Sequence, residues 1–586
     1  MSLFMRCIET YDNMSHLVGK NIEGKQTLAP IGHIITTAKI EITINEKGEF
    51  VRANNIDEKV VVPCTKQSAS RTSKPVAHPL CDQLAFVSTN YSEEKNNLYL
   101  ESLQNWVESK YTCDILQAIY KYVSQNNVYE DIVSNNIKIK NEKDFVVWRI
   151  EGFSKGNGLV CENREIQELY VQYYLSNLDG PIDLCMATYQ HDILIEGQYH
   201  LKGVVPLYGN AKLISSNDKD GFTFRGRLND ANEACSVSYI ASQKAHNVLN
   251  WIVANEYIYL GNRICVAWNP KGNRIPKLDI PIPCFEDDES VTFEGYRNKL
   301  RQVVFNLSND NLKDEFVVTA MLEAATNGRL SVTYYNELPG VTFLEKLGKW
   351  DEETAFSNRY NKVRVPKLFK YALFSYGTYR SETDKFDIDD KIKTQLMQRL
   401  VICRLDGKAF PLDVMRKLVD SASKLQLYSS NTRENLLHTT CSAIRKYSLD
   451  NLGEEISMNL ERDKQNRSYQ FGRLLAILEK AERDTYEKDN EGRETNAIRM
   501  QSAYVQRPMK VCEQIISKVK QGYYQKLNEG QKSYYEKLIE EIMTTIAASV
   551  ANEEELNRPL EEIYIVGYYL QKQDLYTSKE KKEKEA

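Results

Sequence analysis

The chain has 586 residues, of which 42% are hydrophobic and 27% charged, and it carries a net charge of -5 with a pI near 6.0. This length predicts two to four domains, and the negative charge disfavours a free-standing, non-specific nucleic-acid binder, so any nucleic-acid contact has to be local. A mean hydropathy of -0.51 without a long apolar run excludes a membrane span, and the N-terminus lacks a secretory signal pattern, so we expect a cytoplasmic protein.

The N-terminal part reads as a mixture of strands and helices. Between Ile31 and Val62, alternating apolar and polar residues predict an antiparallel hairpin, with its turn at Asn45 to Glu49, and a following strand. Helical spacing predicts helices at Leu98 to Val123 and at Asn163 to Leu175. A strand is expected at Asp144 to Ile150.

A second group of strand signals follows a long apolar helix. The helix is predicted from Val237 to Ala254, and a strand follows at Arg263 to Trp268. Two further strands, Phe316 to Ala324 and Leu330 to Tyr335, flank Asn327-Gly328, which supplies the positive-φ residues of a tight hairpin.

Helical periodicity dominates from Phe343 to the end of the chain. It is broken at Gly377 to Asp387, Pro411, Asp450 to Gly453, Tyr486 to Arg493 and Pro508. We therefore predict an α+β fold in which a sheet-containing N-terminal domain, residues 1–342, precedes an all-helical C-terminal bundle, residues 343–586.

One segment comes close to a phosphate-binding P-loop. Gly19 to Gln26, GKNIEGKQ, has the two glycines and Lys25 at the required spacing. Gln26 stands where a P-loop needs a serine or threonine for magnesium, and a helix-like segment precedes it instead of a strand. The segment therefore does not predict a nucleotide-binding P-loop.

Other chemistry-bearing residues do not form a recognisable catalytic or metal site. His191-Asp192 lacks further metal ligands, and Glu286 to Glu289 suits the N-terminus of the following helix. Cys235 and His246 are expected to be a core cysteine and a histidine on a helix surface. The 12 cysteines contain no CxxC pair. We therefore predict no catalytic residue, no metal and no cofactor.

Two basic loops are candidates for contacts with nucleic acid. Cys64 to Cys81 carries Lys66, Arg71 and Lys74, with no acidic residue between Glu58 and Asp82. Such side chains donate hydrogen bonds to phosphates and base edges. An ordinary solvated loop has the same composition, so both interpretations stay open.

The second loop lies in the stretch from Tyr208 to Trp251, directly before the helix predicted from Val237. It combines glycines, which permit close backbone approach, with Phe222 and Phe224, which offer faces for stacking. Its basic residues are Lys202, Lys212, Lys219, Arg225 and Arg227.

Six extended motifs point to a family. They are GNAKLISSN...FTFRGR...EACSVSYIASQKAHNVLNW, RTSKPVAHPLCDQLAFV, LEAATNGRLSVTYYNELPGVTFLEKLGKW, SYQFGRLLAILEKAERDTY, GRETNAIRMQSAYVQRP and PLEEIYIVGYYLQKQDLY. The resemblance that they carry covers nearly the whole chain in the right order. The chain closely resembles the large subunit of type I-C CRISPR Cascade surveillance complexes, the Csd-type Cas large-subunit family.

The resemblance implies a non-catalytic DNA-recognition subunit without a cofactor. Such a subunit recognises the protospacer-adjacent motif in target double-stranded DNA, promotes strand opening and R-loop formation, and helps recruit the helicase-nuclease, while the guide RNA reads the sequence. The implied partners also include backbone and guide-processing subunits. The alternatives are a nucleic-acid-processing nuclease and a purely structural RNA-binding scaffold.

The resemblance also assigns residues to the DNA contact, which places DNA recognition in residues 1–342. Relatives commonly have a glycine after the RTS motif, where this chain has Lys74-Pro75, and proline favours an extended path for Lys74. The predicted DNA-binding residues are Lys66, Gln67, Arg71, Thr72, Lys74, Asn210, Lys212, Arg225 and Arg227.

In this family the C-terminal segment is also made separately, from an internal start, as the small subunit. Met458 is the candidate start here, because the matching segment begins there. Gly453-Glu454-Glu455 must be encoded GGN-GAR-GAR, which resembles a ribosome-binding sequence. Residues 458–586 would form the small subunit. The candidates in it for contacts with a nucleic-acid backbone are Arg473, Arg493, Arg499 and Arg507.

Overall fold

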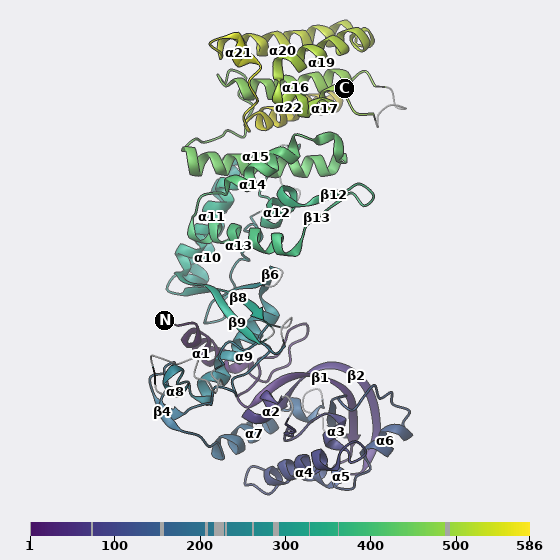
Figure 1. The fold of residues 1–586 in the computed structure, drawn as a ribbon, viewed down its shortest axis with the longest axis vertical. Coiled ribbons are helices and arrows are strands. Elements are labelled where there is room, and N and C mark those ends of the chain that lie inside the picture. The colour runs from purple at the N-terminus through teal and green to yellow at the C-terminus, as the bar shows by residue number, and fades with distance from the viewer. Residues whose placement is uncertain are drawn as a thin grey trace. The chain divides into compact units, whose positions relative to one another are not determined.

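The computed structural model describes residues 2–71, 74–152, 158–205, 209–215, 228, 231–260, 263–284, 292–326, 328–360, 362–486 and 493–585 (Figure 1). The chain forms two compact units. Unit 1 comprises residues 1–275 and 316–337, and unit 2 comprises residues 276–315 and 338–586. Residues 276–315 therefore belong with the C-terminal part of the chain, which the sequence pattern did not indicate.

In its described residues, unit 1 contains two larger sheets, each packed with helices, and a two-stranded ribbon. Its helices are α1 (Leu3–Asn13), α2 (Lys66–Ser70), α3 (Leu84–Val87), α4 (Glu93–Val107), α5 (Asp114–Val123), α6 (Val128–Ser134), α7 (Arg164–Ser176), α8 (Ala231–Ala234) and α9 (Tyr239–Asn255). Its strands are β1 (His33–Ile44), β2 (Phe50–Pro63), β3 (Val146–Ile150), β4 (Ile182–Leu184), β5 (His191–Ile193), β6 (Tyr257–Leu260), β7 (Arg263–Trp268), β8 (Phe316–Thr326) and β9 (Arg329–Pro339).

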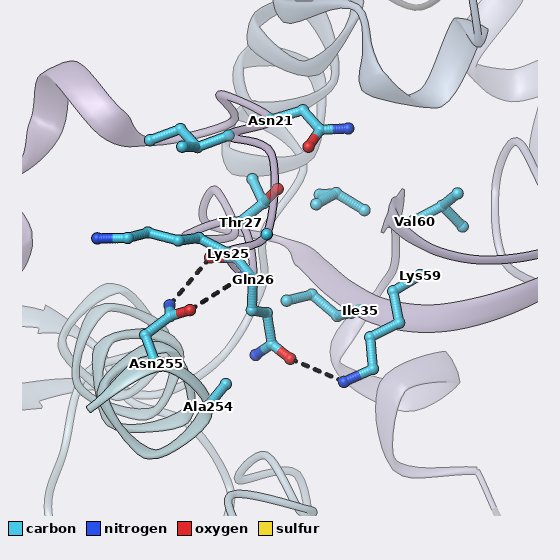
Figure 2. Close-up of a pocket in the computed structure, with 12 residues that line it drawn as sticks. Asn21, Lys25, Gln26, Thr27, Ile35, Lys59, Val60, Ala254 and Asn255 are labelled. Carbon is cyan, nitrogen blue, oxygen red and sulfur yellow. Dashed lines mark hydrogen bonds between the residues drawn. The ribbon is translucent and has the colours of Figure 1, made fainter. Parts of the chain in front are cut away.

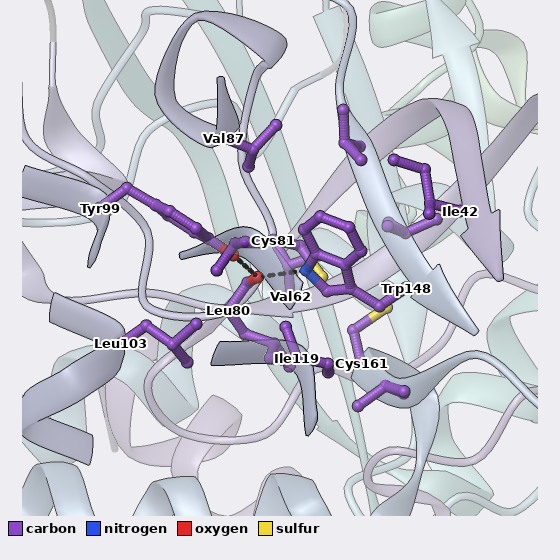
Figure 3. Packing of buried hydrophobic residues seen from close by; sticks show 14 of the residues in the cluster. Ile42, Val62, Leu80, Cys81, Val87, Tyr99, Leu103, Ile119, Trp148 and Cys161 are labelled. Carbon is purple, nitrogen blue, oxygen red and sulfur yellow. Dashed lines mark hydrogen bonds between the residues drawn. The ribbon is translucent and has the colours of Figure 1, made fainter. Parts of the chain in front are cut away.

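The first sheet has the order β2-β1-β3. β1 and β2 form the predicted antiparallel hairpin, closed by a hydrogen bond from Asn45 N to Glu49 O at 2.9 Å, and β3 runs parallel to β1. In the core beside this sheet, Tyr99 Oη and Trp148 Nε1 both donate to the carbonyl of Leu80 at 2.7 Å (Figure 3). Buried tyrosine and tryptophan need such a partner, so these two bonds fix the chain around Leu80.

The second sheet has the order β6-β7-β8-β9. α1 and α9 pack on it through a shared core, which contains Val248 and Ile252 of α9 and Val266 of β7. Trp268 Nε1 donates to Thr10 Oγ1 at 3.0 Å, which joins the end of β7 to α1. This packing holds α9, whose polar residues reappear in the candidate site.

One predicted helix of unit 1 is divided. The sequence predicts one helix from Leu98 to Val123, whereas the structure has α4 and α5 with a turn between them. At the turn, Trp106 Nε1 donates to the carbonyl of Tyr111 at 3.1 Å. This side-chain hydrogen bond, between residues five positions apart, stabilises a reversal of the chain that no glycine or proline marks.

Unit 2 is mainly helical, with two short ribbons. Its helices are α10 (Phe293–Leu307), α11 (Gly340–Thr354), α12 (Leu368–Tyr376), α13 (Asp390–Asp406), α14 (Leu412–Ala422), α15 (Ser430–Leu452), α16 (Arg467–Arg483), α17 (Asn496–Arg499), α18 (Gln501–Gln506), α19 (Pro508–Gly522), α20 (Glu529–Ala548), α21 (Glu553–Leu556) and α22 (Tyr564–Glu585). The ribbons pair β10 (Phe356–Ser357) with β11 (Val363–Arg364), and β12 (Thr378–Arg380) with β13 (Lys385–Asp387).

The predicted α+β class is confirmed, with sheets concentrated in the N-terminal half and helices in the C-terminal region. The ribbons are an addition to the all-helical bundle that the sequence predicts for residues 343–586. β12 and β13 occupy the predicted helix break from Gly377 to Asp387. None of the described helices is both long enough and apolar enough to span a membrane.

α16 is the central helix of the C-terminal segment and packs against α19, α20 and α22 (Figure 1). It meets α22 at two glycines. A Cβ atom on Gly472 would clash with the carbonyl oxygen of Tyr564, and one on Gly567 would clash with that of Tyr469. The close approach of these two helices therefore requires glycine at both positions.

We predict that Gly567→Ala destabilises unit 2 by about 1–3 kcal/mol, because the added methyl group overpacks a backbone contact. In scanning calorimetry of the full chain, the unit 2 transition should fall by about 2–4 °C per kcal/mol. The matched control is Gly522→Ala at the end of α19, where a Cβ atom would meet nothing within 4 Å. Equal transitions in the two variants would contradict the glycine contact.

Candidate nucleic-acid interface

The two basic loops predicted from the sequence meet in unit 1. Arg71 is the C-cap of α2, and its carbonyl accepts a hydrogen bond from Lys202 Nζ at 3.4 Å. Lys202 Nζ also donates to Asn210 Oδ1 at 3.4 Å. Residues 131 positions apart in the sequence therefore lie side by side, and the described parts of the two loops form one surface.

The segment from Lys202 to Lys212 is held by short stretches of β-type pairing. Lys202 and Lys212 form an antiparallel bridge, and Gly203 N donates to Ala211 O at 3.2 Å. Leu330 N, at the start of β9, donates to Lys212 O at 2.9 Å. The segment is thereby fixed to the strands that α9 covers.

A cavity of about 220 Å³ lies beside Lys202. α9 contributes His246, Asn247 and Asn250 to its lining, and the other walls come from Ala29, β1, α2, residues 201–204 and Gly209. None of the described residues that line it is acidic. We call this cavity together with Lys202, Lys212 and Asn210 the Lys202 site.

The charges of the Lys202 site are not balanced locally. Burial lowers the pKa of Lys202, and the nearby Arg71 charge lowers it further. Burial also lowers the pKa of Lys212, with a further contribution from Lys202. In the part of the chain that the structure describes, neither ammonium group is paired with a carboxylate. A bound anion would relieve the repulsion between these cations.

Two buried histidines lie behind the lysines. His200 Nδ1 is 2.8 Å from Ser242 Oγ, and His246 Nδ1 is 2.7 Å from Ser242 O. Burial lowers the pKa of His200 to about 3 and that of His246 to about 4, and the Lys212 charge acts in the same direction. Both imidazoles are therefore neutral at neutral pH, and the positive charge of the site comes from its lysines. His246 was expected on a helix surface; that prediction is wrong, since it is 1% exposed.

Arg71 has a structural partner in the same loop. Its guanidinium donates to both carboxylate oxygens of Asp82, at 2.5 and 2.7 Å, and to the carbonyl of Val76 at 2.8 Å. It also lies over the Phe86 ring, 4.6 Å from the centroid. Asp82 is fully buried. The Arg71 side chain thus closes the loop and does not extend into solvent.

Lys66 is also engaged inside unit 1. Its ammonium donates to the carbonyl of Asp179 at 2.9 Å and to the Glu196 carboxylate at 3.2 Å, and the residue is only 4% exposed. Its backbone N–H donates to Tyr174 Oη at 2.8 Å. A phosphate contact by Lys66 would require the side chain to leave these partners.

The remaining predicted residues of the two loops differ in accessibility. Lys74 and Asn210 are exposed, whereas Gln67 and Lys212 are half-buried. Three further predicted residues lie outside the described residues: Thr72, Arg225 and Arg227.

The four C-terminal arginines are not equivalent. Arg473 is fully buried, and its guanidinium donates to the carbonyl of Arg462 and to the side chains of Gln470, Gln571 and Glu541. Its side chain therefore holds the C-terminal segment together. The other three, Arg493, Arg499 and Arg507, are exposed.

The remaining sequence motifs do not form a metal site in the part of the chain that the structure describes. No three His, Cys, Asp or Glu side chains there are placed to hold an ion. Glu286 to Glu289 lies outside the described residues. The segment from Gly19 to Gln26 follows α1 and a short 3-10 helix, so it lacks the strand that precedes a P-loop.

Sequence reasoning missed the contribution of α9. His246, Asn247 and Asn250 are polar residues in a predicted apolar helix, and two of them are four positions apart. Asn250 Nδ2 donates to the carbonyl of Gly203 at 3.2 Å, so it supports the basic segment directly. Polar residues at helical spacing on a buried face were the available signal.

Comparison with known families decides the assignment. The family described as CRISPR-associated protein (Cas_Csd1) matches residues 8–576. The chain belongs to the Csd1 family. The family resemblance inferred from the sequence motifs is thus confirmed, and the match includes both loops of this Csd1 protein's Lys202 site. No curated protein matches the chain.

We predict that Arg71→Ala destabilises unit 1 of this Csd1 protein by about 3–5 kcal/mol, because it leaves the buried Asp82 carboxylate without its partner. Chemical denaturation should show this as a lower free energy of unfolding. Lys74→Ala, in the same loop but exposed, should stay within about 0.5 kcal/mol of the parent. Arg71→Lys should recover little stability, since lysine lacks the bidentate fork; full recovery would argue against a structural role.

Proposed function

We propose that this chain is the large subunit of a type I-C Cascade. In this role it recognises the protospacer-adjacent motif in target duplex DNA, promotes strand opening and R-loop formation, and helps recruit the helicase-nuclease for antiviral defence. It acts in the cytoplasm, with the guide RNA and the backbone and guide-processing subunits. The observation that carries the proposal is that the two family loops meet at Lys202 and Lys212, which have no carboxylate partner among the described residues.

The local charge of the Lys202 site suits this division of labour. Guide pairing reads the target sequence, so the protein needs only a short contact with the duplex. A net-negative chain repels DNA at long range, and an assembly that brings the duplex to a local cation cluster overcomes this repulsion. Lysine ammonium groups with spare donors bind phosphates as point charges.

We assign different roles to the predicted residues. The proposed contacts with the duplex are Lys74, Lys202, Asn210 and Lys212. Lys74 and Asn210 are exposed, and Lys202 and Lys212 have no carboxylate partner in the part of the chain that the structure describes. Lys66, which is itself buried, and Arg71, whose partner Asp82 is buried, position the loop. The other proposed contacts from the same loops are Gln67, Thr72, Arg225 and Arg227.

We predict that Lys202→Gln and Lys212→Gln weaken binding of the assembled complex to duplex DNA that carries the motif. Each loss should reduce the slope of log affinity against log salt by about 0.9, because one phosphate contact disappears. Assembly, followed by size-exclusion chromatography, should not change. Lys121→Gln on α5 is the matched control, since Lys121 is an exposed lysine of the same unit. Unchanged duplex affinity and slope in both variants would contradict the proposed function.

We further propose that residues 458–586 are also produced from Met458 as the small subunit. Met458 lies in the connection between α15 and α16, after Gly453 ends α15 in the left-handed conformation at φ 71°. In the segment that follows, α16 packs against α19, α20 and α22. Exposed Arg493, Arg499 and Arg507 are its candidates for contacts with a strand backbone.

Release of this segment would uncover polar contacts with the preceding helices. Arg433 donates to both carboxylate oxygens of Glu494, at 2.6 and 2.9 Å. Gln501 Nε2 donates to the carbonyl of Ala422 at 2.9 Å, and Tyr569 Oη donates to Glu434 at 2.5 Å. A separate small subunit would present these groups to another partner or to water.

We predict that Met458→Leu abolishes a short C-terminal product in cells that express the full gene, as detected with a C-terminal tag on a blot. The full-length chain should persist, because Met458 is in a connection and leucine has a similar volume. Met500→Leu, at another methionine of the segment, is the control. A short product of unchanged amount would contradict an internal start at Met458.

A further inference from the structure

The segment that resembles a P-loop lines the cavity shown in Figure 2, although it lacks the P-loop fold. Lys25 N donates to the carbonyl of Ile22 at 3.0 Å, and Gly24 between them takes a φ of 73°, which favours glycine. This turn, β1, β2 and the end of α9 enclose about 340 Å³. We call this cavity the Gln26 pocket.

The amide groups of the Gln26 pocket are used within the protein. Gln26 N donates to Asn255 Oδ1 at 2.9 Å, and Asn255 Nδ2 donates to Gln26 O at 3.1 Å (Figure 2). Lys59 Nζ donates to Gln26 Oε1 at 3.2 Å, which leaves two of its three N–H donors. The pocket is therefore held open by its own hydrogen bonds, and its spare donors are cationic.

The lining of the Gln26 pocket suits a ligand with one anionic and one flat apolar part. None of the described lining residues is acidic, and Ile35, Val60, Val61 and Ala254 supply apolar surface. At the edge of the pocket, Asn21 Nδ2 donates to the Glu162 carboxylate at 3.5 Å. A nucleotide has both parts, a phosphate and a base.

Lys25 and Lys59 extend on opposite sides of Gln26 (Figure 2). Both are exposed, and among the described residues neither is paired with a carboxylate. Asp57, two positions before Lys59 on β2, is paired with Lys39. Two separated cations match successive phosphates of a strand better than one phosphate group.

The Gln26 pocket is adjacent to the Lys202 site. Ile35 lines both cavities, and Gln26 Nε2 donates to Asn250 Oδ1, whose own Nδ2 donates to Gly203 O. One face of α9 borders both, from His246 at one end to Asn255 at the other, over about 13 Å. A strand that leaves the Lys202 site along α9 would reach the Gln26 pocket.

We propose that the Gln26 pocket binds one nucleotide of a single nucleic-acid strand, with its base on the apolar wall and the flanking phosphates on Lys59 and Lys25. This proposal rests on the proposed function, which brings nucleic acid to the Lys202 site. The strand is single because a base enters a pocket only when it is free of its stack and its pairing partner.

The test measures binding of labelled oligo(dT) and oligo(U) to the full chain by fluorescence anisotropy over a series of salt concentrations. Lys59→Gln and Lys25→Gln should each weaken binding several-fold and reduce the salt slope by about 0.7. Ala254→Leu, which fills the cavity without changing charge, should weaken binding and leave the slope unchanged. Lys121→Gln is the control for the loss of one positive charge.

The outcomes separate this proposal from the proposed function. The pocket proposal is overturned if all three pocket variants bind both oligonucleotides as Lys121→Gln does, while Lys202→Gln still weakens duplex binding. The proposed function is overturned instead if neither Lys202→Gln nor Lys212→Gln weakens duplex binding. If the pocket variants weaken binding of oligo(dT) alone, the strand is DNA, and if they weaken binding of oligo(U) alone, it is RNA. Equally weakened binding of both identifies the ligand as the phosphates and pyrimidine ring that the two share.

Discussion

The buried carboxylate of Asp82 is the constraint on which the geometry of the candidate interface depends. It accepts two hydrogen bonds from Arg71 and one each from the backbone N–H groups of His78 and Gln83, both at 2.7 Å. A buried charge is tolerated only when it is paired and hydrogen-bonded in this way. Arg71 therefore has to cap α2 in one position, and the acceptor for Lys202 is the carbonyl of this same residue.

This constraint reaches the core through the neighbouring backbone. Leu80, two positions before Asp82, holds Tyr99 and Trp148 on its carbonyl (Figure 3). The basic loop is thus anchored at both ends, by Arg71 on one side and by the core of the first sheet on the other. Lys74 lies between these anchors and is exposed. A loop with fixed ends presents a flexible side chain at a defined place, which favours recognition of a short duplex motif over non-specific attraction.

The sequence predicts local features of this fold well, because they depend on neighbouring residues. The β1–β2 hairpin follows from alternation around a polar turn, β7 has the predicted bounds, and α15 ends where Gly453 was expected to break it. The turn between α4 and α5 was not predicted, because no glycine or proline marks it and its support is a hydrogen bond that the Trp106 indole donates to the carbonyl of Tyr111. Residues 276–315 belong to unit 2, and the chain then re-enters unit 1 at β8. This division depends on contacts that no local sequence pattern encodes.

For the site, the sequence indicates which loops matter but not which side chains are accessible. The partners of Lys66, Asp179 and Glu196, are more than 100 positions away in the chain. A count of basic residues therefore includes cations that the fold uses internally. A count of basic residues also misses Asn250, because it is neutral, although its hydrogen bonds to Gln26 and Gly203 link the two cavities.

The chemistry of arginine and lysine explains this division. A guanidinium presents a rigid fork that suits carboxylates and carbonyls. Arg71 and Arg473 therefore make their hydrogen bonds inside the protein, and so does Arg404 of α13, which donates to the Asp351 carboxylate. A desolvated ammonium is destabilised in its charged form, as the lowered pKa values of Lys202 and Lys212 indicate. Such a lysine gains most from an arriving anion, because the anion restores the stability of the charged form. In this chain, the half-buried lysines are therefore better candidates for phosphate contacts than the well-paired arginines, even though arginine is the commoner residue for reading bases.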